Sequence, residues 1–409
     1  MHSTAFFRSI ALCFALVPQL RADTDVYLRD VPDYGWFGGA MGTACGNLIG
    51  YWDRHGLPGF YTGPTGNGLA PLNSNGTNFG ITSVWASKAG IDGRSTTNHG
   101  HIDDYWAVYL VPGGQSSYQD TGPDPYLVAH RPEHAPDCIG DFIGLSQRKW
   151  TNMNNECDGN LDGLSFVYWD LSGNARTNFV PGPGAGAPAR DVQSGLRDWT
   201  RSCGYDADVF TQLVEFNPNV PAGRGFTFND LKAEIDAGFP VLLFLQSFTQ
   251  NSRAMPPGSA TGMPRANPAS HAVLAHGYYI ADDGTLMVHN RTSFSDDPRN
   301  ENRILSLWTP DPWTLNVPIR GAIAYHPKPK ITSVTRANGN VTLTWDGPAS
   351  ELYDNITGIT TPVHRYTVER APALNQPFAA IGSPTTDHSA TISDCCGTSA
   401  FFRVSLITP

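Results

Sequence analysis

The chain has 409 residues, a formal net charge of −10, 40% hydrophobic residues and only 16% charged residues. An acidic chain with so few lysines and arginines is a poor ligand for nucleic acid or anionic membranes, so we expect neither as a partner. The hydrophobic fraction is ample for a packed core, while 42 glycines and 32 prolines indicate a loop-rich protein.

Residues 1–22 have the pattern of a secretory signal peptide. Arg8 precedes an apolar run over residues 9–17, and Leu-Arg-Ala at residues 20–22 offers a small residue for cleavage before Asp23. The run is too short to span a bilayer, and no later stretch of the sequence is long and apolar enough to do so. We therefore expect a secreted or periplasmic protein with no membrane span.

Six cysteines follow this leader, and in an exported protein some of them should be paired. They are Cys45, Cys138, Cys157, Cys203, Cys395 and Cys396. A bond between Cys138 and Cys157 would close a short loop and is the pairing we favour. The adjacent cysteines at 395 and 396 could bond to each other only through a strained ring, so at most one of them should be paired, with a distant partner.

The middle of the chain carries two polar clusters, each with two interpretations. Residues 158–163 match the first half of a calcium-binding loop, but position twelve is Trp169 instead of glutamate, so a plain turn is favoured. A metal could also be held by His99, His101, Asp103 and Asp104, where a polar loop is the favoured interpretation. We expect neither a metal nor a cofactor.

Periodic apolar residues predict a helix over residues 190–201.

A helix with a clear start and end is predicted over Thr227–Ala237. Thr227 is a good N-cap, Asp230 is an acidic third residue, and Gly238 followed by Pro240 ends the helix. The apolar run Val241–Gln246 predicts a buried strand directly after it. A long polar loop follows, and its residues 254–268 are placed to overhang a site like a lid.

His271 and Asn290 are the most informative residues of the chain. His271 opens a predicted strand that runs to Tyr278, and the turn at residues 282–284 leads into a second strand that ends at Asn290. An imidazole at the start of one strand and an amide at the end of its hairpin partner can lie side by side. An enzyme uses such a pair to hold a catalytic histidine in one tautomer. A thiol near the N-terminus of the mature chain would complete a Cys-His-Asn set.

The pattern of apolar and polar residues changes near residue 328. Short alternating strands are predicted at residues 331–335, 340–345, 364–370, 390–392 and 400–406. Their number and spacing favour a small all-β sandwich over residues 328–409. The first three of these strands, with Trp345 late in the second, resemble a fibronectin type III domain.

Several motifs recur in one order within the domain assigned to residues 23–326: a helix before Gly-Phe-Pro-Val at 238–241, Ser-His at 270–271, Gly-Tyr at 277–278 and Asn290. In this order they resemble papain-like cysteine peptidases, in particular the branch that includes the bacteriocin leader-peptidase-like domains. The match covers roughly residues 30–60 and 227–292. It implies an α+β domain built from an N-terminal helix and an antiparallel sheet, with a peptide or protein as substrate.

The resemblance leaves two positions for the nucleophile. An ungapped match to the family's Gly-Cys pair, counted back from Gly-Tyr-Trp-Asp at 50–53, falls on Ala40. If Thr43 instead caps the helix, Cys45 is its second residue, where the helix dipole would favour a thiolate.

Two functions therefore remain open. In the first, Cys45 attacks a peptide or amide carbonyl, His271 is general base and then acid, and Asn290 orients His271. In the second, the peptidase-like domain is inactive and binds peptides or proteins, with an adhesive or scaffold role. The oligomeric state does not follow from the sequence.

Overall fold

The computed structural model of the chain describes residues 23–34, 40–63, 65, 67–73, 139–144, 167–181, 190–245, 271–293, 304–309, 318–393 and 400–407. Its helices are α1 (Ala40–Arg54), α5 (Ile139–Phe142), α6 (Val192–Ser202) and α7 (Phe228–Asp236). None of the helices in these ranges is long and apolar enough to cross a membrane. Helix α7 begins and ends as predicted, because Thr227 and Asp230 form a reciprocal capping box and Gly238 takes a φ of 87°.

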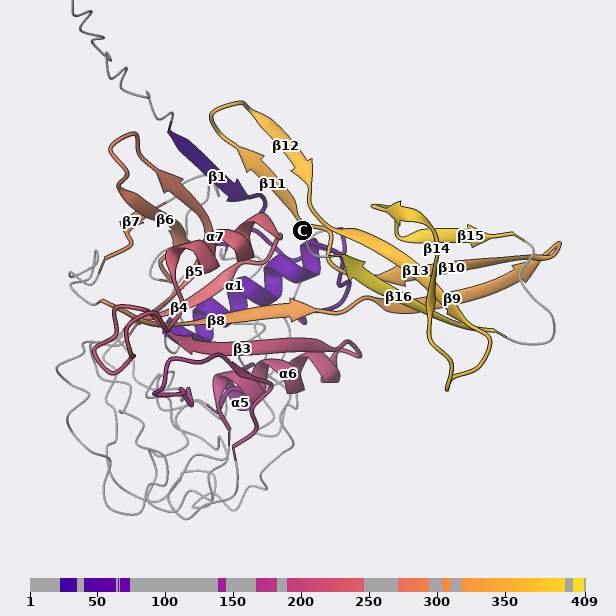
Figure 1. The fold of residues 1–409 in the computed structure, drawn as a ribbon, viewed down its shortest axis with the longest axis horizontal. Helices are drawn as coiled ribbons and strands as arrows, with labels where there is room; N and C mark the ends of the chain where they lie inside the picture. Colours follow the sequence, from indigo (N-terminus) through magenta and orange to yellow (C-terminus); the bar gives the residue numbers. More distant parts are fainter. Residues whose placement is uncertain are drawn as a thin grey trace, which may run out of the picture.

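One large antiparallel sheet dominates the fold (Figure 1). Its strands are β1 (Thr24–Leu28), β2 (Arg176–Thr177), β3 (Ala207–Leu213), β4 (Val241–Leu245), β5 (His271–Ile280), β6 (Leu286–Arg291), β7 (Ile304–Leu307), β8 (Ile319–Pro327), β11 (Glu351–Asp354) and β12 (Ile359–Pro362). The strand order is β12-β11-β1-β5-β4-β8-β3-β2, and β6 pairs with both β5 and β7.

The expected α+β papain-like class is wrong for the part of the chain that the structure describes. Here 43% of the residues lie in strands and 16% in helices, in several antiparallel sheets. The prediction rested on a helix around Cys45 and a helix over Thr227–Ala237, but α7 spans only 9 residues. It also ended the first sheet before residue 328, whereas two further strands, β11 and β12, join that sheet from beyond it.

The two faces of the large sheet are covered by different helices. On β8, His326 bonds Glu234 of α7, while the neighbouring Tyr325 bonds Thr200 of α6 and packs near Trp52 of α1. Successive side chains of a strand point to opposite faces. Helix α7 therefore covers one face, and α1 and α6 cover the other.

The C-terminal part forms two three-stranded sheets around a second, smaller core. The first contains β9 (Lys330–Ala337), β10 (Asn340–Asp346) and β15 (Ser389–Ile392), and the second contains β13 (Arg365–Ala371), β14 (Ala379–Thr385) and β16 (Phe401–Ile407). Leu343, Trp345 and Tyr366 are buried in the core between them. The predicted strand positions are confirmed, while the likeness to fibronectin type III domains stays a prediction.

The β11–β12 hairpin leaves these small sheets and extends the large one. Strand β11 pairs with β1, and Asn355 in the hairpin turn donates to the Asp25 carboxylate at 2.6 Å. The approach to the hairpin is bonded to the end of α1, through Gly347 N to Gly56 O at 2.9 Å and Ala349 N to His55 O at 3.0 Å. The boundary near residue 328 stays a prediction, but the backbone hydrogen bonding of the large sheet continues across it.

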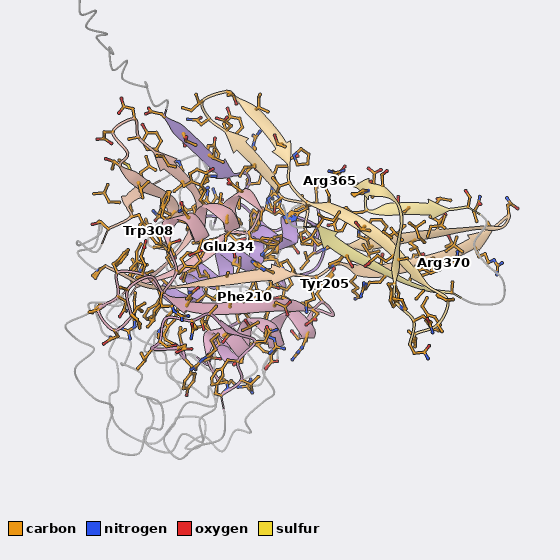
Figure 2. All side chains as sticks on the ribbon, in the orientation of Figure 1. Tyr205, Phe210, Glu234, Trp308, Arg365 and Arg370 are labelled. Carbon is orange, nitrogen blue, oxygen red and sulfur yellow. The ribbon has the colours of Figure 1, made fainter. Side chains whose placement is uncertain are left out.

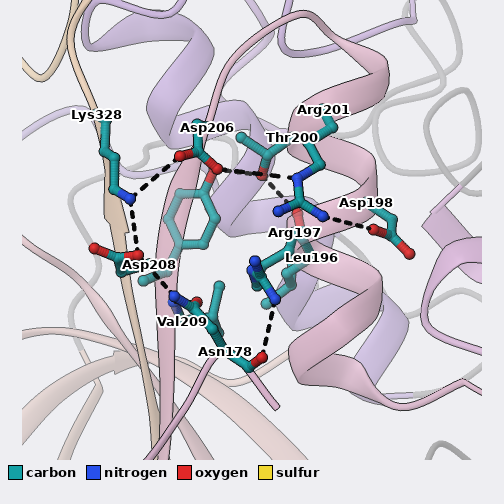
Figure 3. Close-up of polar contacts among 11 residues, drawn as sticks. Asn178, Leu196, Arg197, Asp198, Thr200, Arg201, Asp206, Asp208, Val209 and Lys328 are labelled. Carbon is teal, nitrogen blue, oxygen red and sulfur yellow. Dashed lines mark hydrogen bonds and ion pairs between the residues drawn. The ribbon is translucent and has the colours of Figure 1, made fainter. Parts of the chain in front are cut away.

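Lys328, at that boundary, is bonded to the large sheet as well (Figure 3). Its ammonium lies 3.2 Å from an Asp206 oxygen and 2.9 Å from an Asp208 oxygen. Asp208 also accepts from the Asn178 amide at 2.7 Å. These contacts place the chain as it leaves β8, although charges this exposed contribute little to stability.

Candidate active site

Cys45 lies inside α1 and not at its start. The helix begins at Ala40, so Thr43 is a helical residue and does not cap the helix. The interpretation that made Cys45 the second helical residue is therefore wrong. Cys45 is the sixth residue, beyond the first turn, where the helix dipole has little effect on a thiol.

The Cys45 thiol is fully buried, and burial raises its pKa well above the ordinary value of 9.0. Because the thiolate is the nucleophilic form, this surrounding suppresses the reactivity that a catalytic cysteine needs. Ala40, the other candidate position, is the first residue of α1 and is half-buried, and it carries no nucleophile.

His271 is the first residue of β5 and is 5% exposed. Its Nε2 contacts the Thr292 carbonyl, just past the end of β6. Burial lowers the pKa of its imidazole to about 4, so the ring is neutral at pH 7. A neutral imidazole can act as a base, provided that a nucleophile lies within hydrogen-bond reach.

Asn290 is placed away from His271. It pairs with Ala275, four residues along β5 from His271, which is about 13 Å of strand. The Asn290 amide donates to the Val288 carbonyl at 3.3 Å and to the Ser306 hydroxyl at 3.2 Å. The structure therefore does not bring the amide beside the imidazole.

Strand alternation also separates His271 from Cys45. Ala324, on the α7 face of β8, lies beside Val241 of β4, which in turn lies beside Ala275 of β5. His271 precedes Ala275 by four residues in an unbroken register with β4, so its side chain points to the same α7 face. Cys45 belongs to α1, which covers the opposite face. Within the part of the chain that the structure describes, no hydrogen bond joins Cys45 to His271.

A buried polar cluster beside Asn290 was missed by the sequence reasoning. The His289 Nε2 lies 2.6 Å from an Asp25 oxygen, and both side chains are almost fully buried. Arg291 donates to the Val31 carbonyl at 2.9 Å and lies 3.9 Å from Asp33. The available signal was the alternation of His289 and Arg291 about Asn290. These residues join β6 to the N-terminal segment, which makes their role structural.

A second missed arrangement is a pocket on the α7 face, with a volume of about 160 Å³. Phe210, Phe226 and Ala324 are among its apolar lining residues, and Asp230, Glu234 and His326 among its polar ones. The sequence signal was the spacing of Asp230 and Glu234, since residues four apart share one side of a helix.

Several predicted sites lie outside the described residues. These are the signal peptide, Cys138, Cys157, Cys395, Cys396, the calcium-like loop at 158–163, the polar cluster at 99–104 and the loop at 254–268.

Comparisons of the chain with protein-family models, with curated proteins and with solved structures found no match.

Proposed function

We propose that this chain is an exported protein that binds a peptide or protein ligand and does not hydrolyse it. The observation that carries the proposal is the full burial of Cys45 within α1. A cysteine hydrolase needs its thiol, imidazole and amide side by side, whereas Cys45 lies in α1 and His271 and Asn290 lie apart on the α7 face. The pocket between α7 and the sheet supplies a concave surface for a ligand instead.

Thiol labelling tests the absence of cysteine catalysis, and the chain contains its own control. Cys203 is only half-buried, whereas Cys45 is fully buried. We expect an irreversible thiol-directed peptidase inhibitor to leave Cys45 unlabelled in the native protein between pH 6 and 8. A small alkylating reagent should modify Cys203 first, and Cys45 only after unfolding.

The matched variant is His271→Ala. If Cys45 is not paired with an imidazole, this substitution leaves the labelling rate of the Cys45 thiol unchanged. Rapid modification of native Cys45 below pH 7 that disappears in His271→Ala would establish an active cysteine hydrolase and refute the proposal.

Export is tested separately from binding. We expect the mature protein to begin at Asp23 and to be recovered outside the cytoplasm after expression in a bacterial host. N-terminal sequencing of the recovered protein checks the cleavage position, and a product that retains residues 1–22 in the cytoplasm contradicts it.

A further inference from the structure

The pocket on the α7 face combines apolar walls with an acidic rim. It lies between α7 and strands β3 and β8. Two of its lining residues, Glu234 of α7 and Phe210 of β3, are labelled in Figure 2. Its volume of about 160 Å³ is below the roughly 300 Å³ at which pockets begin to take drug-sized ligands. A pocket of this size suits a single side chain.

The acidic groups of the rim retain capacity to accept hydrogen bonds. Asp230 receives the Thr227 backbone N–H at 2.8 Å and the Thr227 hydroxyl at 2.7 Å, both on Oδ2. Glu234 meets the His326 ring through Oε2, at 2.6 Å. Among the described contacts, the second oxygen of each carboxylate has no hydrogen-bond donor.

The described lining residues include no lysine or arginine whose positive charge would neutralise the carboxylates of the rim. Lys232, the lysine of α7, bonds Asp236 and lies over the Tyr278 ring, 5.0 Å from its centroid. It is therefore engaged on another side of the helix. The described rim carries two carboxylates and one histidine.

The aromatic groups fix the geometry of the pocket. The His326 ring lies 5.0 Å from Phe210 and 4.3 Å from Phe239 between ring centroids, which holds its Nε2 toward Glu234. Phe210 and Phe226 offer ring surface to an aliphatic chain, and aromatic faces also attract a cation.

We propose that this pocket binds one lysine or arginine side chain of a polypeptide ligand. The methylene stem packs on Phe210 and Phe226, and the charged head donates to Asp230 and Glu234. The inference rests on the proposed binding function, because it names the part of the ligand that the α7 face recognises.

The test uses the full mature chain titrated with Nα-acetyl-lysine amide and Nα-acetyl-arginine amide, followed by NMR or calorimetry. Nα-acetyl-norleucine amide is the matched neutral probe, since its stem is similar and uncharged. We expect at least one cationic probe to bind in the millimolar range and about ten-fold more tightly than norleucine amide. Equal affinity for the neutral probe, or no binding of either cation, overturns the proposal.

Two variants locate the binding. Glu234→Gln should weaken the binding of the cationic probe about ten-fold. Asp236→Asn removes the same charge from the same helix outside the pocket and should leave this affinity unchanged. Ala324→Leu fills the pocket without changing its charge and should also abolish binding. Loss in both charge variants would show a general electrostatic effect and refute the assignment.

Cys45 labelling on the same protein sample separates the two proposals. An unreactive Cys45 with no cation binding refutes the pocket assignment alone, and a reactive, His271-dependent Cys45 refutes the proposed function.

Discussion

We expect His364 to make the stability of the fold dependent on pH. It lies at the end of the β11–β12 hairpin segment, 4% exposed, with its ring 5.1 Å from Phe239 and 6.2 Å from Trp52 between centroids. Burial lowers the pKa of its imidazole from 6.5 to about 3. Folding therefore favours the neutral ring, and stability is present above pH 6.5 and is lost as the pH falls from 6.5 toward 3.

The magnitude follows from the two pKa values. Between pH 7 and 5 the unfolded chain takes up a proton at His364 and the folded chain does not, which removes about 2 kcal/mol from the free energy of unfolding. His364→Leu abolishes this titration, so its loss of stability between pH 7 and 5 should be smaller than that of the native chain by this amount.

Urea unfolding at pH 7 and pH 5, followed by tryptophan fluorescence, measures the difference. Val363→Ala is the matched control, because Val363 also packs against Gly238 but carries no proton, and it should shift stability equally at both pH values. An unchanged pH dependence in His364→Leu would show that folding does not change the pKa of His364 and would refute the reasoning.

Two further substitutions and one truncation test the contact between the hairpin and the first core. Gly238→Ala should destabilise the fold by about 2 kcal/mol in urea, because Gly238 has a φ of 87° and the added carbon would lie 2.3 Å from the His364 Nε2. Tyr51→Phe should cost about 1 kcal/mol by the same assay, because it removes the 2.6 Å hydrogen bond to the Ser350 hydroxyl; a neutral result would mean that water replaces the bond. Truncation after residue 328 removes the strand that covers β1, so we expect the shortened chain to associate in sedimentation experiments, and a stable monomer would contradict this.

Local signals predicted the parts of the fold that depend on neighbouring residues. Thr227 and Gly238 bound α7 because capping groups lie within a few residues of the backbone they satisfy. Alternation predicted β10 and β13 because each strand has one buried face. The β11–β12 hairpin was not predicted, because its place is set by pairing with β1, more than 300 residues away in sequence.

The candidate site shows the same division. Helix formation around Cys45 was predicted with two possible starts, one at Ala40 and one capped by Thr43, and the structure has the helix begin at Ala40, where Ala40 and Met41 are good helix formers. Hairpin pairing of the strands that carry His271 and Asn290 was also predicted. Their separation was not predicted, because the pairing of β5 with β6 places Asn290 opposite Ala275, and β5 extends four residues beyond that pair to His271.

The position of β1 has a consequence for the order in which the chain folds. This first strand of the described chain is held between β5, which begins at residue 271, and β11, which begins at residue 351. During synthesis from the N-terminus, both neighbours of β1 emerge long after it, so its hydrogen bonds form late. Contacts of such sequence separation slow folding. Both edges of β1 therefore stay unpaired until the strands beyond residue 271 have been made.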